Sequence, residues 1–72
     1  MHYTQRMKEL REEKELNQEQ IAEKLEMHQT QYSRYERNAT GMPIEVLIKL
    51  AKFHNITVDY ILGLTDEKRK LF

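Results

Sequence analysis

Apolar residues recur at helical spacing in five short stretches of this 72-residue chain, and this pattern limits the possible folds more than any other feature. Glycine occurs twice and proline once, so little in the chain interrupts a helix. Strand-like alternation is confined to residues 56–58. Because helices of about ten residues are unstable in isolation, we predict an all-α fold in which five helices pack on one shared core.

The bounds of the first three helices follow from apolar spacing and capping residues. The first helix is expected from about Thr4 to Lys14, and the third from about Gln29 to Arg37. Asn17 can cap the second helix, because Gln20 stands at the capping-box position three residues later. The second helix is expected to bury Ile21, Ala22 and Leu25.

The last two helices are expected on either side of a short turn. Pro43 is predicted to be the first residue of the fourth helix, and the fifth is expected to begin after Thr57 and to end at Gly63. The predicted buried side chains are Ile44, Leu47, Leu50 and Ala51 in the fourth helix and Val58, Ile61 and Leu62 in the fifth.

The domain is expected to cover residues 1–65, followed by a short charged tail over residues 66–72. The tail is either disordered or docked, and its apolar end could then take part in a dimer contact. The candidates for that contact are Leu64, Leu71, Phe72 and the edge of the fifth helix near Val58 or Tyr60.

Composition excludes several classes of function. Without cysteine the chain cannot form a disulfide or a thiolate zinc site, and we expect it in the reducing cytoplasm. Its three histidines are far apart in the sequence, so no metal site is expected. The only serine, Ser33, lacks the motif of a nucleophile, so we expect no enzyme. We likewise expect no cofactor, no membrane span and no second domain to hold a small ligand.

Residues 18–37 predict a helix-turn-helix. Two short helices separated by about three residues must cross at a steep angle rather than run antiparallel. Ala22 permits the close approach of the two helices, while Met27 and Tyr32 can fill the angle between them.

One face of the predicted third helix is polar and free of acidic residues. Thr30, Ser33, Arg34 and Arg37 share this face at i, i+3, i+4 and i+7, whereas Tyr32, Tyr35 and Glu36 point the other way. Short polar groups and guanidinium groups can hydrogen-bond base edges in a DNA major groove. The alternative is an ordinary solvated helix face, and the stripe taken alone favours that alternative.

Glu36 lies on the inward side of the same helix and needs a partner, because a buried unpaired carboxylate is costly. Arg11 on the first helix could supply that partner. Spacing alone leaves a second alternative equally open, in which Glu36 sits at the rim and stays hydrated.

Five segments, taken in order, resemble one known family. They are residues 10–13 (LREE), 17–25 (NQEQIAEKL), 32–37 (YSRYER), 43–53 (PIEVLIKLAKF) and 55–65 (NITVDYILGLT). This ordered set resembles the Cro-type phage-repressor helix-turn-helix family, the XRE family of bacterial regulators. The resemblance implies a compact five-helix lambda-repressor-like fold, sequence-specific binding of double-stranded DNA, and a homodimer whose half-sites lie about 34 Å apart.

The resemblance also implies roles for individual residues. Base contacts fall to Gln29, Thr30, Ser33 and Arg34. Gln18 would contact a phosphate and brace the third helix, and Arg11 and Glu36 would form a salt bridge. We expect Asn17, His28 and Arg37, near the same surface, to contact the DNA backbone as well.

The chain departs from the family pattern at four places. Glu26 stands where the turn between the helices usually has glycine, and a left-handed conformation there would cost on the order of 1 kcal/mol. Glu15 replaces another frequent glycine. His28 replaces the usual Ser or Thr cap of the third helix, so a weaker cap is expected. Residues 38–43 lack the lysine and arginine that relatives often carry, leaving phosphate contact there to backbone N–H groups.

Charge is the main argument against DNA binding. Twelve basic residues balance twelve acidic ones, although phosphate contacts dominate affinity for DNA. The acidic excess lies at residues 15–27, where Glu19, Glu23 and Glu26 form a separate stripe. Arg6 or Lys8 could flank the DNA site. An alternative function is therefore a protein-interaction module of the same fold, antitoxin-like or adaptor-like, with weak or no DNA binding.

Overall fold

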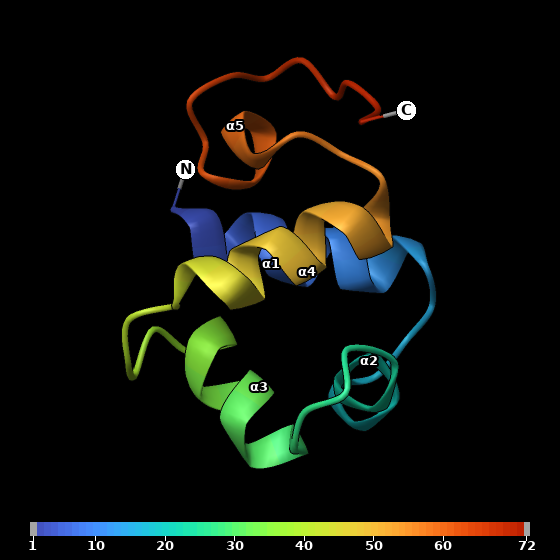
Figure 1. Ribbon diagram of the computed structural model, residues 1–72, viewed down its shortest axis with the longest axis vertical. Coiled ribbons are helices and arrows are strands. Elements are labelled where there is room, and N and C mark those ends of the chain that lie inside the picture. Colours follow the sequence, from blue (N-terminus) through green and yellow to red (C-terminus); the bar gives the residue numbers. More distant parts are fainter. Residues whose placement is uncertain (1, 72) are drawn as a thin grey trace.

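The computed structural model describes residues 2–71 of the chain (Figure 1). These residues contain five helices and no strand. They are α1 (Tyr3–Glu13), α2 (Gln18–Lys24), α3 (Gln29–Glu36), α4 (Ile44–His54) and α5 (Val58–Ile61). The predicted all-α, five-helix fold is confirmed.

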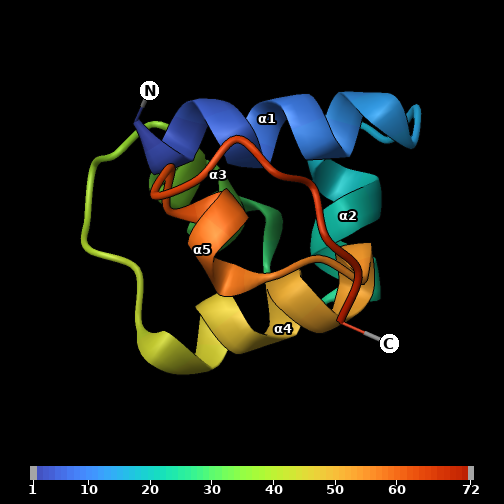
Figure 2. The same ribbon diagram turned by 90° about the horizontal axis from the view of Figure 1, so that it is seen from above.

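Each helix occupies a distinct place around one core. α5 lies above and α2 and α3 lie below in Figure 1, while the view from above shows α1 and α4 on opposite sides of the molecule (Figure 2). α3 packs on α1 and α2, and α5 packs on α1 and α4. The buried apolar side chains belong to Met7, Leu10, Ile21, Ala22, Leu25, Tyr32, Tyr35, Val46, Leu50, Ala51, Ile56 and Ile61.

Local chemistry explains where the helices begin. Asn17 accepts a hydrogen bond from the backbone N–H of Gln20, whose side chain accepts from the N–H of Asn17, so the predicted capping box is present. Thr57 caps α5 through the N–H of Tyr60. His28 forms no side-chain cap on α3, in agreement with the weaker cap predicted there.

Two of the helix ends carry backbone strain. Glu15 (φ 56°) and Glu26 (φ 58°), the residues that replace glycine, both adopt the left-handed conformation. A residue with a β-carbon is disfavoured there by about 1 kcal/mol. The chain therefore keeps two costly turns, one on either side of α2.

The register of α4 differs from the prediction at its first turn. Pro43 is the N-cap rather than the first helical residue. Ile44 is 71% exposed, and Val46 is buried in its place. Val46 and Leu50 are four residues apart and lie on the buried side of α4. Ile44 is two residues before Val46, so its side chain points to the opposite, solvent-facing side. Leu62 was also wrongly predicted as buried, because α5 ends at Ile61.

A buried arginine attaches the segment after α5 to α1. Arg6 is only 5% exposed, pairs with Asp66 at 2.7 Å, and donates to the backbone oxygens of Tyr60 and Thr65. Its guanidinium also lies 4.0 Å from the centre of the Tyr60 ring. The expectation that Arg6 flanks a DNA site is therefore wrong.

Residues 66–71 continue along the surface of the helices. The N–H of Thr57 donates to the backbone oxygen of Arg69 at 3.1 Å, and Lys68 pairs with Glu13 of α1. The predicted dimer candidates Leu64 and Leu71 are exposed, while Phe72 lies outside the described residues.

Candidate nucleic-acid interface

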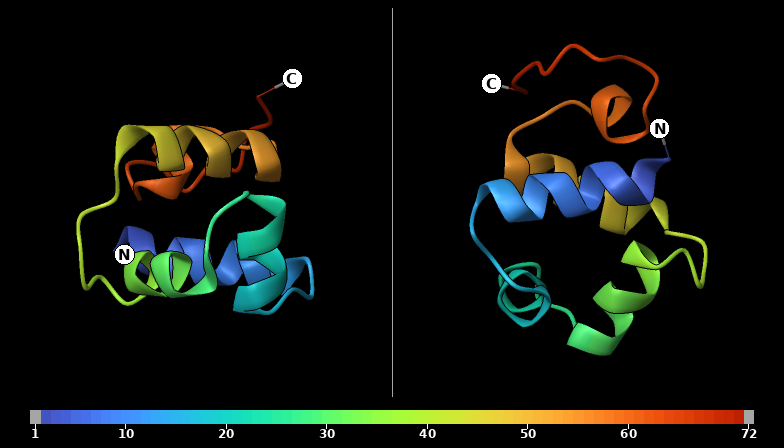
Figure 3. Two further views of the ribbon diagram at one scale, coloured as in Figure 1. Left: turned by 60° about the horizontal axis from the view of Figure 1, so that its bottom comes forward. Right: turned by 180° about the vertical axis from the view of Figure 1, so that it is seen from behind.

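The turn between α2 and α3 sets the angle of the predicted recognition helix. After the left-handed Glu26, the N–H of Met27 donates to the backbone oxygen of Ala22 at 2.9 Å. Ala22 is 1% exposed and Tyr32 is fully buried. A small side chain on α2 thus allows close contact while a large one on α3 fills the angle. α3 lies at the bottom of the molecule in Figure 1 and in front of α1 when the bottom is turned forward (Figure 3, left).

A buried ion pair fixes α3 to α1. Arg11 binds Glu36 through two parallel hydrogen bonds of 3.0 and 2.9 Å. Their side chains are 12% and 6% exposed. Gln18 at the start of α2 donates to Glu36 at 3.2 Å, and Arg11 also donates to the backbone oxygen of Leu16. Three helices therefore meet at one carboxylate.

Electrostatics at this junction favour the ionised pair. Burial by itself would raise the pKa of Glu36, but the hydrogen bonds from Arg11 and Gln18 outweigh it and leave that pKa below its ordinary value. The same pairing raises the pKa of Arg11. Burial raises the pKa of the neighbouring Tyr32 hydroxyl, so this group stays protonated.

The predicted base-reading residues lie together on the outer side of α3. Gln29, Thr30 and Arg34 are exposed, and Ser33 is half-buried beside them. α3 presents no acidic residue at these positions; its one carboxylate, Glu36, is turned inward to Arg11. The outer side of α3 thus offers a hydroxyl pair, an amide and a guanidinium to a partner.

The four predicted backbone-contacting residues differ in how free they are. His28 and Arg37 are exposed at the two ends of α3. Asn17 is exposed, but its side-chain oxygen is used by the capping box. Gln18 is half-buried and directs one N–H of its amide to Glu36. The second N–H of that amide can donate a hydrogen bond to a phosphate.

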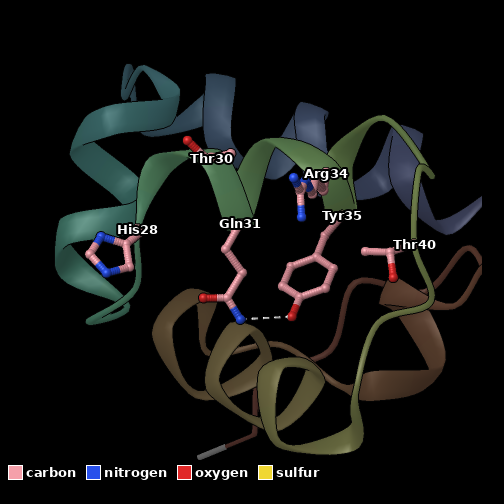
Figure 4. A pocket seen from close by; sticks show the side chains of 6 residues that line it. All are labelled: His28, Thr30, Gln31, Arg34, Tyr35 and Thr40. Carbon is pink, nitrogen blue, oxygen red and sulfur yellow. Dashed lines mark hydrogen bonds between the residues drawn. The ribbon is translucent and has the colours of Figure 1, made fainter.

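A hollow of about 550 Å³ runs beside α3 and contains residues that the sequence reasoning missed. Figure 4 shows Gln31 and Tyr35 side by side on the flank of α3, where the amide of Gln31 donates to the Tyr35 hydroxyl at 2.9 Å. Thr40, on the loop after α3, borders the same hollow. The complete lining is His28, Thr30, Gln31, Arg34, Tyr35 and Thr40.

Gln31 was missed because it carries neither charge nor apolar surface, and so gives no periodic signal. Its separation of four residues from Tyr35 was the available clue, since side chains at i and i+4 are neighbours on a helix. The contact matters because it holds the Gln31 amide against the Tyr35 hydroxyl, in the hollow that Arg34 also lines.

Acidic residues adjoin the start of α3. Glu23 and Glu26 line a second hollow of about 330 Å³ together with Met27, His28 and Gln31. Residues 38–43 add no positive charge. Favourable charge for an anionic partner therefore comes mainly from Arg34 and Arg37.

Metal-binding clusters and membrane-spanning helices are both missing from the part of the chain that the structure describes. Within residues 2–71, no group of three or more histidine, aspartate or glutamate side chains could hold a metal ion. Over the same range, no helix is both long and apolar enough to cross a bilayer.

Comparison with known proteins agrees with this geometry. The helix-turn-helix family model matches residues 7–61, which include most of α1 and all of the other four helices. The chain belongs to the XRE family of helix-turn-helix regulators.

Two relatives come from Bacillus subtilis (strain 168). The uncharacterized HTH-type transcriptional regulator YobD is 42% identical over 65 residues, which cover 90% of this chain and 58% of that protein. The HTH-type transcriptional regulator ImmR is 33% identical over 70 residues, which cover 97% of this chain and 55% of that protein. The chain thus spans just over half the length of these two relatives.

Proposed function

We propose that this XRE-family chain is a bacterial or phage transcriptional regulator that binds a double-stranded DNA operator in the cytoplasm, as a dimer and in the role of a repressor. Residues 1–65 form the DNA-binding unit and residues 66–72 a short tail. The observation that carries the proposal is the outer side of α3, where Gln29, Thr30 and Arg34 are exposed while Arg11 and Glu36 hold the helix from behind.

The roles of the side chains follow from their positions. Arg34 can donate two hydrogen bonds to one guanine, and Gln29 can pair with one adenine. Thr30 and Ser33 add shorter polar contacts. Gln18, together with Asn17, His28 and Arg37, contacts phosphates and sets the register of α3 on the duplex.

The proposal is tested by titrating labelled duplexes with the chain and its variants. The wild-type chain should prefer an operator selected from random DNA over a scrambled duplex. Arg34→Ala should cost about 1–3 kcal/mol of binding free energy on the operator and relax the preference at one base pair. Gln18→Ala should weaken binding to both duplexes alike. Equal wild-type affinity for the two duplexes would contradict the proposal.

A second candidate function is a protein-interaction module. It is favoured by zero net charge and by Glu23 and Glu26 at the start of α3. This function requires a protein partner and no salt-dependent binding to DNA. A pull-down combined with a DNA mobility-shift assay separates the two candidates.

A further inference from the structure

The outward side of α4 carries exposed apolar surface that the DNA-binding role does not use. Ile44 is 71% exposed and Ile48 is 43% exposed. The two residues are four positions apart and therefore occupy the same side of the helix. Large aliphatic side chains placed together on a surface are typical of contact sites.

Charged residues of opposite sign border these isoleucines. Glu45 lies in the first turn of α4 and Lys52 in the last, and both are exposed. Their separation of seven residues places them on one side, about two turns apart. Lys49 lies between them but donates to the backbone oxygen of Leu25 at 3.1 Å, so it is already engaged within the chain.

This arrangement is complementary to itself. If two α4 helices pack antiparallel, Ile48 lies near Ile48 of the second copy, and Glu45 of each copy lies opposite Lys52 of the other. A two-fold interface forms every such contact twice. An apolar centre with opposite charges at its two ends therefore fits a second copy of this chain.

The position of α4 agrees with a dimer that binds two half-sites. α4 runs across the front of the molecule in Figure 1, with α3 below it, and α1 covers it in the view from behind (Figure 3, right). A two-fold axis that stands vertical in Figure 1, in front of α4, makes the two α4 helices antiparallel. The same axis leaves both α3 helices on one side, where a single duplex can meet them.

We propose that the α4 face, defined as Ile44, Glu45, Ile48 and Lys52, is the surface through which two copies of this chain associate. The biological purpose of this dimer rests on the proposed function, but the association itself can be measured without DNA. The competing surface is the segment after α5, where Leu64 is 73% exposed.

The first experiment measures mass by sedimentation equilibrium up to millimolar concentration. The wild-type chain should approach twice 8.8 kDa, and Ile48→Asp should stay monomeric. Leu64→Asp is the matched control and should associate like the wild type. Circular dichroism should show unchanged thermal unfolding of Ile48→Asp, because that side chain is not in the core. A monomeric wild type, or a loss of association in Leu64→Asp alone, would overturn the proposal.

Charge reversal tests the register. Glu45→Lys and Lys52→Glu should each raise the dimer dissociation constant about fivefold, because each places like charges together at two symmetric positions. The double variant should return to within about twofold of the wild type, since the opposite pairs are restored. Additive weakening in the double variant would rule out the Glu45–Lys52 pairing and with it the antiparallel packing.

A cysteine test does not depend on the strength of association. The natural chain has no cysteine, so Ile48→Cys and Leu64→Cys each introduce a single thiol. Mild oxidation should link Ile48→Cys into a dimer faster than Leu64→Cys, and the reverse order would favour the competing surface. If the linked dimer forms as expected but neither it nor the wild type binds an operator, the DNA-binding proposal fails while the α4 face stands. If the wild type binds the operator and the linked dimer does not, the α4 face is overturned as the interface of the DNA-bound dimer.

Discussion

The Arg11–Glu36 pair shows how much of this fold depends on single residues. Both side chains are nearly buried, and Gln18 completes the hydrogen bonding of the carboxylate. Removing one partner leaves the other charge buried and unpaired. Glu36→Ala should therefore lower the free energy of unfolding by about 3 kcal/mol, measured by urea denaturation. Glu9→Ala is the control: it removes a carboxylate outside this junction and should change the free energy of unfolding little.

The pH dependence of this pair has a definite sign. Because the pKa of folded Glu36 lies below its ordinary value of 4.5, the stability it confers is present above that pH and is lost as the pH falls further. The difference in unfolding free energy between the wild type and Glu36→Gln should be constant near pH 7 and shrink below about pH 4.5. A difference that persists unchanged at about pH 2 would contradict this account.

His54 gives a second pH effect in a different window. Burial, and then the charge of Lys14, lowers the pKa of His54 to about 4, and neither ring nitrogen has a hydrogen-bond partner among the described residues. Between the ordinary pKa of 6.5 and the folded pKa of about 4, the unfolded chain binds a proton at His54 that the folded chain does not. The free energy of unfolding of the wild type should therefore fall as the pH is lowered through that interval. His54→Phe should flatten this fall in thermal midpoint, whereas the exposed His28→Phe should not.

At the scale of elements, the left-handed turn before α3 stores removable strain. Glu26→Gly should raise the free energy of unfolding by about 0.5–1 kcal/mol, since glycine adopts φ 58° without a β-carbon clash. Glu26→Gln is the control, because it removes the same charge and keeps the β-carbon. Thermal unfolding of the two variants separates strain from charge, and equal gains would assign the effect to charge.

The sequence predicted elements whose cause is local and failed where the cause is tertiary. The Asn17 capping box follows from neighbouring residues, and the left-handed Glu15 and Glu26 stand where the resembled family often has glycine. The outward orientation of Ile44 could not be predicted in this way, because it depends on how α4 packs against the core. The burial of Arg6 depends on a segment 60 residues away in the chain, and local charge patterns carry no trace of it.

The candidate site was predicted to a similar extent. The helical period alone placed Thr30 and Arg34 on the outer side of α3, and the structure finds both exposed there. The hollow beside them, with the tethered Gln31 and the loop residue Thr40, depends on the path of residues 38–43 after α3. That path was not available from periodicity.

At the scale of the whole molecule, the balance of charge should control binding strength. Zero net charge and a loop without basic residues leave few phosphate contacts. Each phosphate contact contributes about −0.9 to the slope of log affinity against log salt. For each monomer, we expect the slope of log affinity against log salt to be no steeper than about −4. Anisotropy titration over a range of salt concentrations measures it, and Arg37→Ala should make the slope shallower by about 1.

The central claim is that the outer side of α3 reads DNA sequence. Selection of bound duplexes from a random pool, carried out in parallel with the wild type and Arg34→Ala, tests it most directly. The wild type should enrich two symmetric half-sites centred about 34 Å apart, and the variant should lose preference at one base pair in each half-site. A wild-type chain that enriches no sequence, or a variant that enriches the same motif with the same preferences, would contradict the claim.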